Sequence, residues 1–561
     1  MSTATSLHRA QETADLVDAV KFLIVPFIAA ADRAASTRAT GKSDTAGVQD
    51  PQARNVLVRS YEPKALTQRL NFALPKQEGK GRAGFVEAVK DVLEYSVNTW
   101  DQGFLDKLSA STNAVWCNQS ACLSDSLRLT RGCRLESPQS YYFLSSTQMS
   151  GPSCPACQST TRSADLRTQV QVHVYKVSPV LTVVEKTTAR ELAALFGFEG
   201  PRAGGICCQG GSASNLTSLV TARNALFPAC RTQGNRDKEF AVFTSIHGHY
   251  SVEKAARTMG LGSAAVVKVP ADSTGRMDPA ALRNAVAAAR QAGRTPLYVN
   301  ATAGTTVHGA FDPLEAVAAV CREFGVWLHV DASWGGPAVF STIHRHKLAG
   351  SHLADSITVS PHKMLNVPLT CSMLLTDDTA VFHRANTLPA DYLFHANVEG
   401  EHGNKAEGQG VMEADEVWDL ADLTLQCGRR SDALKFALAW IYYGATGFER
   451  QVDHAFDMAG YLATLIQEHP NFELLSPNPP PCLQVCFYHA PGGRAGDCAA
   501  ENTKRTARLA KRLIDRGFMV DYAAGDRGSF FRVVTNFQTL RTTVEGLVKA
   551  LGSLGRELSH L

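Results

Sequence analysis

The sequence predicts an α/β fold built on a mostly parallel central sheet, with a smaller α/β domain at the C-terminus. Residues 300–371 follow the pattern strand, crossover helix, strand, long loop, strand, which is typical of parallel sheets. Residues 427–561 combine a long helical stretch with short strands rich in aromatic and β-branched residues. A chain of 561 residues also exceeds a single hydrophobic core, so we expect two or three subdomains.

Two strands of the central stretch end in residues that carry chemistry. The apolar run from Val326 to Val330 ends in Asp331, and a β-branched run is followed by SPHKM, which contains Lys363. Strand C-termini line the ligand crevice of an open α/β sheet, so we expect both residues to face one site. A pyridine-ring cofactor needs a carboxylate at its ring nitrogen and a lysine amine that holds its aldehyde as a Schiff base.

These motifs resemble the group II pyridoxal-phosphate (PLP) decarboxylases, which include glutamate, cysteine-sulfinate, aspartate and aromatic-amino-acid decarboxylases. The resemblance rests on HVDASWGG and SPHKM and extends from about Val86 to the C-terminus; NATAGTTVHGAFDP, HRHKLAG and YLF are most similar to the branch with acidic substrates. It implies PLP-dependent transferase fold type I (aspartate aminotransferase-like) and PLP as the cofactor. The implied reaction is α-decarboxylation of a small acidic L-amino acid: glutamate, aspartate or cysteine sulfinate.

Composition excludes several other classes of protein. The net charge of +3 favours neither nucleic acid nor a membrane surface as a partner. The longest apolar run near the start, Phe22 to Ala31, contains Pro26, is too short to span a bilayer and lacks the layout of a signal peptide. The 14 cysteines are scattered and fit reduced thiols better than a disulfide framework. We therefore expect a cytoplasmic protein.

Residues 1–113 are expected to form an N-terminal helical segment. Helical periodicity covers Ala14 to Ala35 and Gly84 to Thr99. The resemblance implies that this segment packs across a partner subunit, and hence a homodimer. It also places Lys107, in GFLDKLSAST, beside the substrate side-chain pocket, where a lysine would pair with a substrate carboxylate or sulfinate. A solvated lysine at a helix end is an equally good interpretation.

Residues 114–170 interrupt the pattern. They are rich in Ser, Thr and Cys and have neither helical nor strand periodicity. We interpret them as an irregular insertion, with a mis-spliced translation as the alternative. The CPAC motif from Cys154 to Cys157 is compatible with half a zinc site or a redox pair, but no second CxxC or CxxH lies nearby, so no metal is expected.

Residues 171–430 are predicted to form the large PLP-binding domain. A glycine turn at Gly210 and Gly211 precedes a helix that we expect to open at Ser214. Backbone amides and small hydroxyl residues at a helix N-terminus form an anion site, so Ser212, Ala213 and Ser214 should hold the cofactor phosphate. An ordinary serine N-cap is the alternative interpretation.

The resemblance assigns further roles in this domain. It implies that His249 stacks on the cofactor ring and relays a proton, that Asp331 and Lys363 take the ring nitrogen and the aldehyde, and that Tyr392, in a catalytic loop, protonates the substrate carbon after CO2 leaves. Contacts to the ring and phosphate are implied for four more residues: Thr306, Ser333, Ser360 and His362.

Residues 431–561 are predicted to form the small C-terminal domain. A long helical stretch, the strand LQVCFYHA, a helix from Thr503 to Arg516 and the strands FMVDYAA and FFRVVT give an α/β sandwich. The resemblance places Arg532 where the substrate α-carboxylate is held, a role that suits the planar fork of its guanidinium group.

Three functional interpretations stay open from the sequence. The first is a PLP-dependent decarboxylase of a small acidic amino acid. The second keeps this chemistry but takes aromatic or other amino acids. The third is a catalytically impaired PLP-binding homologue, which the irregular residues 114–170 motivate and the intact Asp331, Lys363, Tyr392 and Arg532 oppose.

Overall fold

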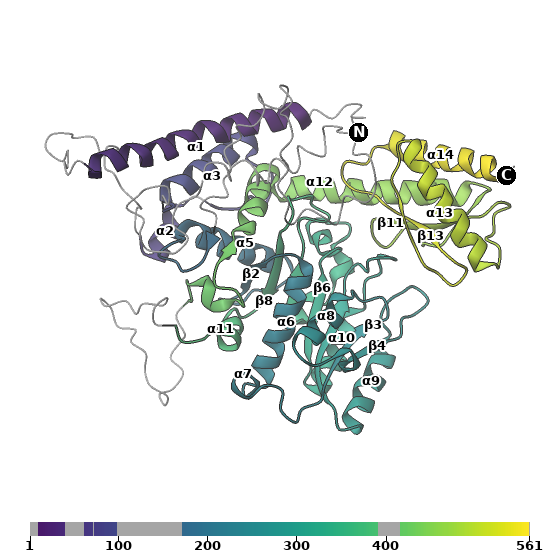
Figure 1. Cartoon of the computed structure of the whole chain (residues 1–561), viewed down its shortest axis with the longest axis horizontal. Coiled ribbons are helices and arrows are strands. Elements are labelled where there is room, and N and C mark those ends of the chain that lie inside the picture. Colours follow the sequence, from purple (N-terminus) through teal and green to yellow (C-terminus); the bar gives the residue numbers. More distant parts are fainter. Residues whose placement is uncertain (1–8, 40–60, 71, 98–170, 391–415, 560–561) are drawn as a thin grey trace, which may run out of the picture. The chain divides into compact units, whose positions relative to one another are not determined.

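The computed structural model describes residues 9–39, 61–70, 72–97, 171–390 and 416–559 (Figure 1). The chain divides into two compact units. One comprises Met1–Phe72, Gly81–Val183 and Gly428–Ser431, and the other comprises Ala73–Lys80, Val184–Cys427 and Asp432–Leu561. In the described residues, no helix combines the length and apolar character that crossing a membrane requires.

The first unit is mainly helical. It contains α1 (Arg9–Ala39), α2 (Pro63–Arg69) and α3 (Gly81–Tyr95), and α1 packs against α3. The helices expected near residues 14–35 and 84–99 are therefore present, although α3 begins and ends a few residues early. A short antiparallel pair joins β1 (Gln171–Val172) to β9 (Arg429–Arg430). Residues 98–170, including the predicted insertion, lie outside the described residues.

The second unit is organised around a seven-stranded sheet in the order β2-β8-β7-β6-β5-β3-β4. Neighbours from β7 to β4 pair in parallel, whereas β8 is antiparallel to both β2 and β7. The prediction of a mostly parallel central sheet is confirmed. The strands are β2 (Gly204–Cys208), β3 (Phe240–Ser245), β4 (Val266–Val269), β5 (Thr295–Thr302), β6 (Trp327–Ala332), β7 (Ser356–Val359) and β8 (Ser372–Thr376).

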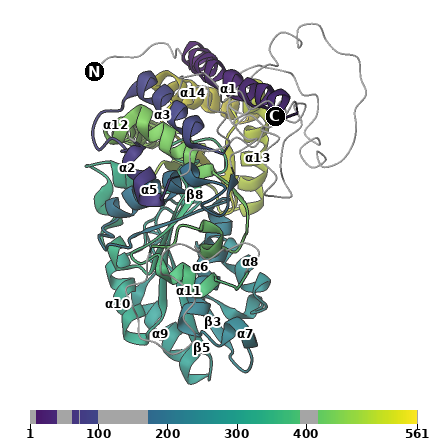
Figure 2. The ribbon, with the colours of Figure 1, turned by 90° about the vertical axis from the view of Figure 1, so that its left-hand side faces the viewer.

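Helices cover both faces of this sheet, which explains why most of its strands are buried along their length rather than at alternate residues. Figure 2 shows the sheet between the pair α6 and α8 and the pair α9 and α10. The α9 helix begins with Pro279 because Asp278 caps it, its carboxylate accepting hydrogen bonds from two backbone amides. The helices are α5 (Pro179–Leu195), α6 (Gly211–Leu226), α7 (Cys230–Gln233), α8 (Ser251–Thr258), α9 (Pro279–Gln291), α10 (Leu314–Phe324) and α11 (Ala380–Asn386).

Short 3-10 helices fill the connections of the second unit, chiefly between β6 and β7. Their bounds are Ser263–Ala265, Gly336–Phe340, Arg345–Leu348, Ser351–Leu353 and Leu420–Leu423.

The C-terminal part of this unit is a four-stranded antiparallel sheet with helices packed against it. Its order is β10-β11-β13-β12, and α12, α13 and α14 bury an apolar cluster against it. The predicted strands and helices are confirmed; β10 and α14 were not predicted. The bounds are α12 (Asp432–Glu468), with non-helical backbone at Gly444, β10 (Phe472–Leu474), β11 (Gln484–His489), α13 (Ala499–Asp515), β12 (Asp521–Ala523), β13 (Phe530–Val534) and α14 (Arg541–Ser559).

Candidate active site

Asp331 and Lys363 lie at the C-terminal ends of neighbouring parallel strands. Asp331 is the last residue but one of β6 and aligns with Thr358 on β7. Lys363 follows β7 in a turn that its amide closes by donating to the Ser360 carbonyl at 3.0 Å. The charges of Asp331 and Lys363 each act on the pKa of the other. The structure therefore brings together the two residues that the sequence singled out first.

The Asp331 carboxylate is buried but well supplied with donors. Asn215 Nδ2 donates to Asp331 Oδ2 at 2.8 Å, and the Ser333 amide donates to Asp331 Oδ1 at 3.1 Å. Burial alone would raise the pKa of Asp331, but the charge of Lys363 and the hydrogen bonds from Ser333 and Asn215 together lower it below its ordinary value. The structure thus holds an ionised carboxylate at the end of β6.

Lys363 has the properties of a reactive amine. Its side chain is accessible to solvent, and it has neither a hydrogen bond nor an ion pair with any other described residue. The surrounding protein desolvates the amine and lowers its pKa, while the charge of Asp331 raises it, and the net shift is downward. A larger fraction of the amine is therefore neutral, which is the form that attacks a carbonyl carbon.

The N-terminus of α6 faces the same strand ends. The helix begins at Gly211, three residues before the boundary expected from the sequence, because the amides of Ala213 and Ser214 already donate to the Gly210 carbonyl. The first amides of a helix have no partner within it and favour anions. Ser212 is exposed at this turn, whereas Ser214 is buried beneath it.

A cluster of three buried serines lies under this turn. Ser372 Oγ lies 3.0 Å from Ser214 Oγ and 3.1 Å from Ser360 Oγ. The Ser214 side chain therefore supports the turn from the protein side, whereas the Ser212 side chain is exposed to an approaching anion. Ser372, which lies nine positions after Lys363, was not predicted.

Gly211 and Ser333 join the helix to β6. A Cβ atom on Gly211 would lie 2.5 Å from Ser333 Oγ, so only glycine allows this close approach. Ser333 Oγ is buried and has no hydrogen-bond partner among the described residues. Buried hydroxyl groups are normally paired, so this oxygen is a candidate contact for a bound group.

Two of the predicted histidines lie beside Asp331 and Lys363. His249, in the loop between β3 and α8, is half-buried, and its Nδ1 lies 2.8 Å from Ser251 Oγ. Burial lowers the pKa of His249. The charge of Asp331 raises this pKa and the charge of Lys363 lowers it, and the net shift is downward, so the ring is neutral at pH 7. His362 Nδ1 contacts the backbone of Cys371, and burial lowers its pKa as well.

Arg532 and Thr306 lie next to each other. Arg532 Nη1 donates to the Thr306 carbonyl at 3.1 Å, and Arg532 Nη2 forms an ion pair with Asp521 at 2.5 Å. Arg532 Nε is buried without a partner in the described part of the chain. Two neighbours thus hold the guanidinium group in place. Two further predicted residues, Lys107 and Tyr392, lie outside the described residues.

Sequence reasoning missed three residues that form hydrogen bonds with Asp331, with His249 or with each other: Asn215, Ser251 and His329. Asn215 directly follows the Ser-Ala-Ser motif, and His329 precedes Asp331 by two positions, on the same face of β6. The sequence does mark Asn215 and His329, because each is a polar residue inside a segment that is otherwise apolar. Their partners could not be identified without the fold.

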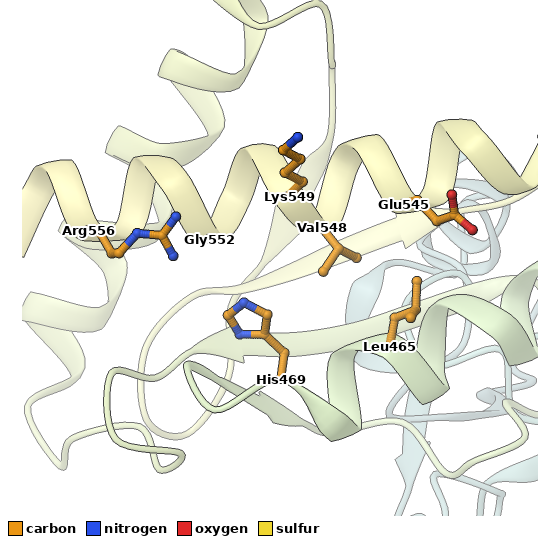
Figure 3. A pocket seen from close by; sticks show the side chains of 7 residues that line it. All are labelled: Leu465, His469, Glu545, Val548, Lys549, Gly552 and Arg556. Carbon is orange, nitrogen blue, oxygen red and sulfur yellow. The ribbon is translucent and has the colours of Figure 1, made fainter.

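A separate pocket lies in the C-terminal part of the second unit (Figure 3). Its lining comes from the end of α12 and from α14: Leu465, His469, Glu545, Val548, Lys549, Gly552 and Arg556. These residues include none of those predicted for the site, and the pocket lacks the neighbouring acid and lysine of the strand ends.

The strand ends define a PLP-type site. An amine shifted toward its neutral form, an ionised buried acid, an anion-favouring helix N-terminus and the unpaired Ser333 hydroxyl match the aldehyde, ring nitrogen, phosphate and ring substituents of that cofactor. The residues present therefore fit the group.

Comparisons with known proteins agree with this class. Residues 168–490 match the model of the pyridoxal-dependent decarboxylase conserved domain. The chain is 51% identical to an L-aspartate decarboxylase of Metarhizium robertsii over 556 residues, 99% of each chain. It is 37% identical to a glutamate decarboxylase-like protein of Gibberella zeae, over 86% of this chain and 89% of the relative.

Solved structures give the same result. The crystal structure of mouse CSAD superposes with a TM-score of 0.62 at 31% identity, covering 89% of this chain and 93% of that one. The chain belongs to the pyridoxal-dependent decarboxylase family. It is an amino acid decarboxylase, a lyase whose cofactor is pyridoxal phosphate.

Proposed function

We propose that this enzyme removes the α-carboxyl group of a small acidic L-amino acid, with L-aspartate as the first candidate and glutamate and cysteine sulfinate as the others. The observation that carries the proposal is the 51% identity to an L-aspartate decarboxylase along 99% of both chains. Sequence similarity at this level, without gaps in coverage, favours a shared substrate class.

Lys363 and Asp331 are proposed as the residues that activate the cofactor. When bound, pyridoxal phosphate supplies an electron sink for the pair of electrons left by departing CO2. Lys363 holds its aldehyde through the neutral amine that partial desolvation favours. Asp331 keeps the ring nitrogen protonated, because an ionised carboxylate in a buried position stabilises a neighbouring positive charge.

The remaining cofactor contacts are proposed to surround this pair. Ser212, Ala213 and Ser214 hold the phosphate at the start of α6, with Ser214 acting from beneath the turn. His249, neutral and half-buried, would contact the cofactor ring and can move a proton through its Nε2 atom. Contacts to the ring and phosphate are completed by Thr306, Ser333, Ser360 and His362.

The substrate is proposed to be held at both of its acidic ends. Arg532 binds the α-carboxylate, and its contacts with Thr306 and Asp521 fix the plane of the guanidinium group beforehand. Lys107 pairs with the side-chain acid group, and Tyr392 returns a proton to the substrate carbon. By holding the α-carboxylate, Arg532 would orient the bond that breaks toward the electron sink that the cofactor would supply.

We also propose that the enzyme is a cytoplasmic homodimer whose N-terminal helical segment forms the subunit contact. The proposed division is 1–113 for this segment, 114–170 for the insertion, 171–430 for the PLP-binding domain and 431–561 for the C-terminal domain. Size-exclusion chromatography with light scattering tests the dimer directly.

A screen for CO2 release from individual L-amino acids tests the substrate. We expect the highest kcat/KM with aspartate, lower values with glutamate and cysteine sulfinate, and none above background with aromatic amino acids. Lys107→Ala should raise KM for acidic substrates at least about ten-fold, since a charge-assisted contact is lost. Lys90→Ala, at an exposed lysine of α3, is the matched control. Preferred release of CO2 from an aromatic amino acid would overturn the proposal.

A further inference from the structure

A chain of buried hydrogen bonds runs beneath Asp331 and His249. Its centre is Asn215 on α6, which is 2% exposed. Asn215 Nδ2 lies 2.8 Å from Asp331 Oδ2 and 2.9 Å from Ser251 Oγ, while Asn215 Oδ1 lies 3.1 Å from His329 Nε2. The Asn215 amide therefore links α6 to two other elements, β6 and α8.

The ionised Asp331 fixes the direction of these bonds. A carboxylate only accepts, so Asn215 must present its NH2 group to Asp331 and its carbonyl oxygen to His329. His329 is fully buried, and burial lowers its pKa, so the ring is neutral and carries one proton. That proton must lie on His329 Nε2, because the Asn215 oxygen can only accept.

The far side of His329 is consistent with this assignment. His329 Nδ1 must accept, and two hydroxyl groups lie within reach, Ser356 Oγ at 2.8 Å and Ser218 Oγ at 2.9 Å. Trp327 Nε1, which can only donate, lies 3.0 Å from Ser356 Oγ and leaves the Ser356 proton available for His329. The series of hydrogen bonds therefore begins at the Trp327 Nε1 donor and ends at the Asp331 carboxylate.

A branch of the chain reaches His249. The second hydrogen of Asn215 Nδ2 is donated to Ser251 Oγ, so the Ser251 hydroxyl is free to donate to His249 Nδ1 at 2.8 Å. The Ser251 amide also points to His249 Nδ1, at 3.2 Å. With Nδ1 accepting from both groups, the proton of the neutral ring lies on Nε2, the atom that does not contact Ser251.

We propose that Asn215 is a positioning residue that sets two proton locations at once, keeping Asp331 ionised for the cofactor ring nitrogen and His249 protonated on Nε2. The inference rests on the roles proposed above for Asp331 and His249 and deepens them. His329 serves as the support that prevents the Asn215 amide from turning over.

The energetic argument follows from burial. A carboxylate shielded from water depends on its few protein donors, and losing a hydrogen bond to a charged group changes an equilibrium by about ten- to a hundred-fold. Among the described residues, Asn215 and the Ser333 amide are the neutral donors to Asp331. Without Asn215 the ionised form of Asp331 is less stabilised, so we expect the proton between Asp331 and the ring nitrogen to lie more on Asp331 and less on the nitrogen.

The test uses the full-length holoenzyme loaded with pyridoxal phosphate that carries 15N at the ring nitrogen. The 15N chemical shift reports whether that nitrogen is protonated, and equilibrium dialysis gives the dissociation constant of the cofactor. For Asn215→Ala we expect the ring nitrogen to lose its proton at a lower pH than in the wild type. The cofactor should also dissociate about ten-fold or more readily.

Two other variants test the hydrogen bond to Asp331 and the hydrogen bonds to His249 separately. Asn215→Leu keeps the approximate volume of the side chain but cannot donate, so it should change the ring-nitrogen signal in the same direction as Asn215→Ala. Ser251→Ala removes only the hydroxyl between Asn215 and His249. It should leave the ring-nitrogen signal unchanged, lower kcat about five-fold and alter its pH profile.

Asn224→Ala is the matched control. Asn224 lies on the same helix, is also buried, and donates to the Ala385 carbonyl without contacting the network. It should lower stability without changing the ring-nitrogen signal. Wild-type behaviour of the ring nitrogen and of cofactor affinity in both Asn215 variants would overturn the inference, as would an unchanged kcat pH profile in Ser251→Ala. An unprotonated ring nitrogen in the wild type would instead overturn the proposed role of Asp331.

Discussion

The central sheet and the C-terminal sheet of the second unit bury different kinds of side chain. Beneath the ends of β6 and β7, the interior holds Asp331, His329 and Asn215, joined to serines by hydrogen bonds. Between β11, β13 and their helices, the interior is apolar, with Phe487 and Phe531 stacked at 5.4 Å. Apolar burial alone suffices to hold a sheet and its helices together.

The two interiors differ in how much stability depends on the pairing of buried polar groups. Each buried polar group must be paired to avoid a desolvation cost of about 1–3 kcal/mol. The central sheet pairs most of these groups, but several have no partner in the described residues, among them Asn300 Nδ2, Thr302 Oγ1 and Thr358 Oγ1 as well as Ser333 Oγ. Of these atoms, Ser333 Oγ lies next to Asp331 at the candidate site, where a ligand can supply the missing contact.

The largest expected effect is a loss of activity, without a loss of stability, when Lys363 beside the central sheet is replaced. Lys363→Ala should lower kcat/KM for CO2 release by at least about 10³-fold, because the amine that holds the cofactor aldehyde is lost. The long-wavelength absorbance of the bound cofactor should disappear with it. The free energy of unfolding should change by less than about 1 kcal/mol, since the side chain is solvent-accessible.

Lys268→Ala serves as the control for this prediction, because Lys268 is an exposed lysine on β4, another parallel strand. It should leave both activity and absorbance unchanged. Retention of the absorbance band in Lys363→Ala would remove the basis for the proposed role of this lysine.

The second prediction tests the apolar interior of the C-terminal sheet. Phe531→Ala should reduce the free energy of unfolding by about 3–5 kcal/mol, since Phe531 is fully buried and its removal leaves a cavity. Chemical denaturation measures this loss, and the absorbance of the bound cofactor should persist while the protein stays folded. Val534→Ala, at a partly exposed position of the same strand, should cost less than about 1 kcal/mol. Equal losses in the two variants would contradict the comparison.

The smallest effect concerns pH and a buried histidine outside the site. Burial, together with the charges of Arg505 and His469, lowers the pKa of His489 to about 4. A depressed histidine pKa contributes stability that is present above its unfolded value of about 6.5 and is lost as the pH falls toward 4. His489→Leu should therefore reduce the loss of unfolding free energy between pH 7 and pH 5 by about 2 kcal/mol.

Urea denaturation at the two pH values measures this difference. The variant should retain part of the pH dependence, because His329 is depressed in the same direction, while Asp312 and Asp355, with pKa values raised to about 6, act in the opposite sense. An identical pH dependence in the wild type and His489→Leu would show that His489 becomes protonated without cost.

The sequence by itself determined the features that depend on local patterns. The strands ending in Asp331 and in SPHKM, the glycine turn before α6 and the helices and strands of the C-terminal sheet all follow from periodicity and turn residues close in the chain. The identity of the cofactor came from these same residues, because a carboxylate and a lysine at adjacent strand ends suit few other groups.

Only the tertiary structure decided how the buried polar residues pair. Asn215 and Asp331 are 116 positions apart, and Ser372, His329 and Ser251 each bond to residues on other elements. A sequence pattern shows that such a residue is polar in a buried segment but not which partner it meets. That choice depends on which side chains face each other after helices and strands have packed, so the proton locations beneath the site are a property of the fold.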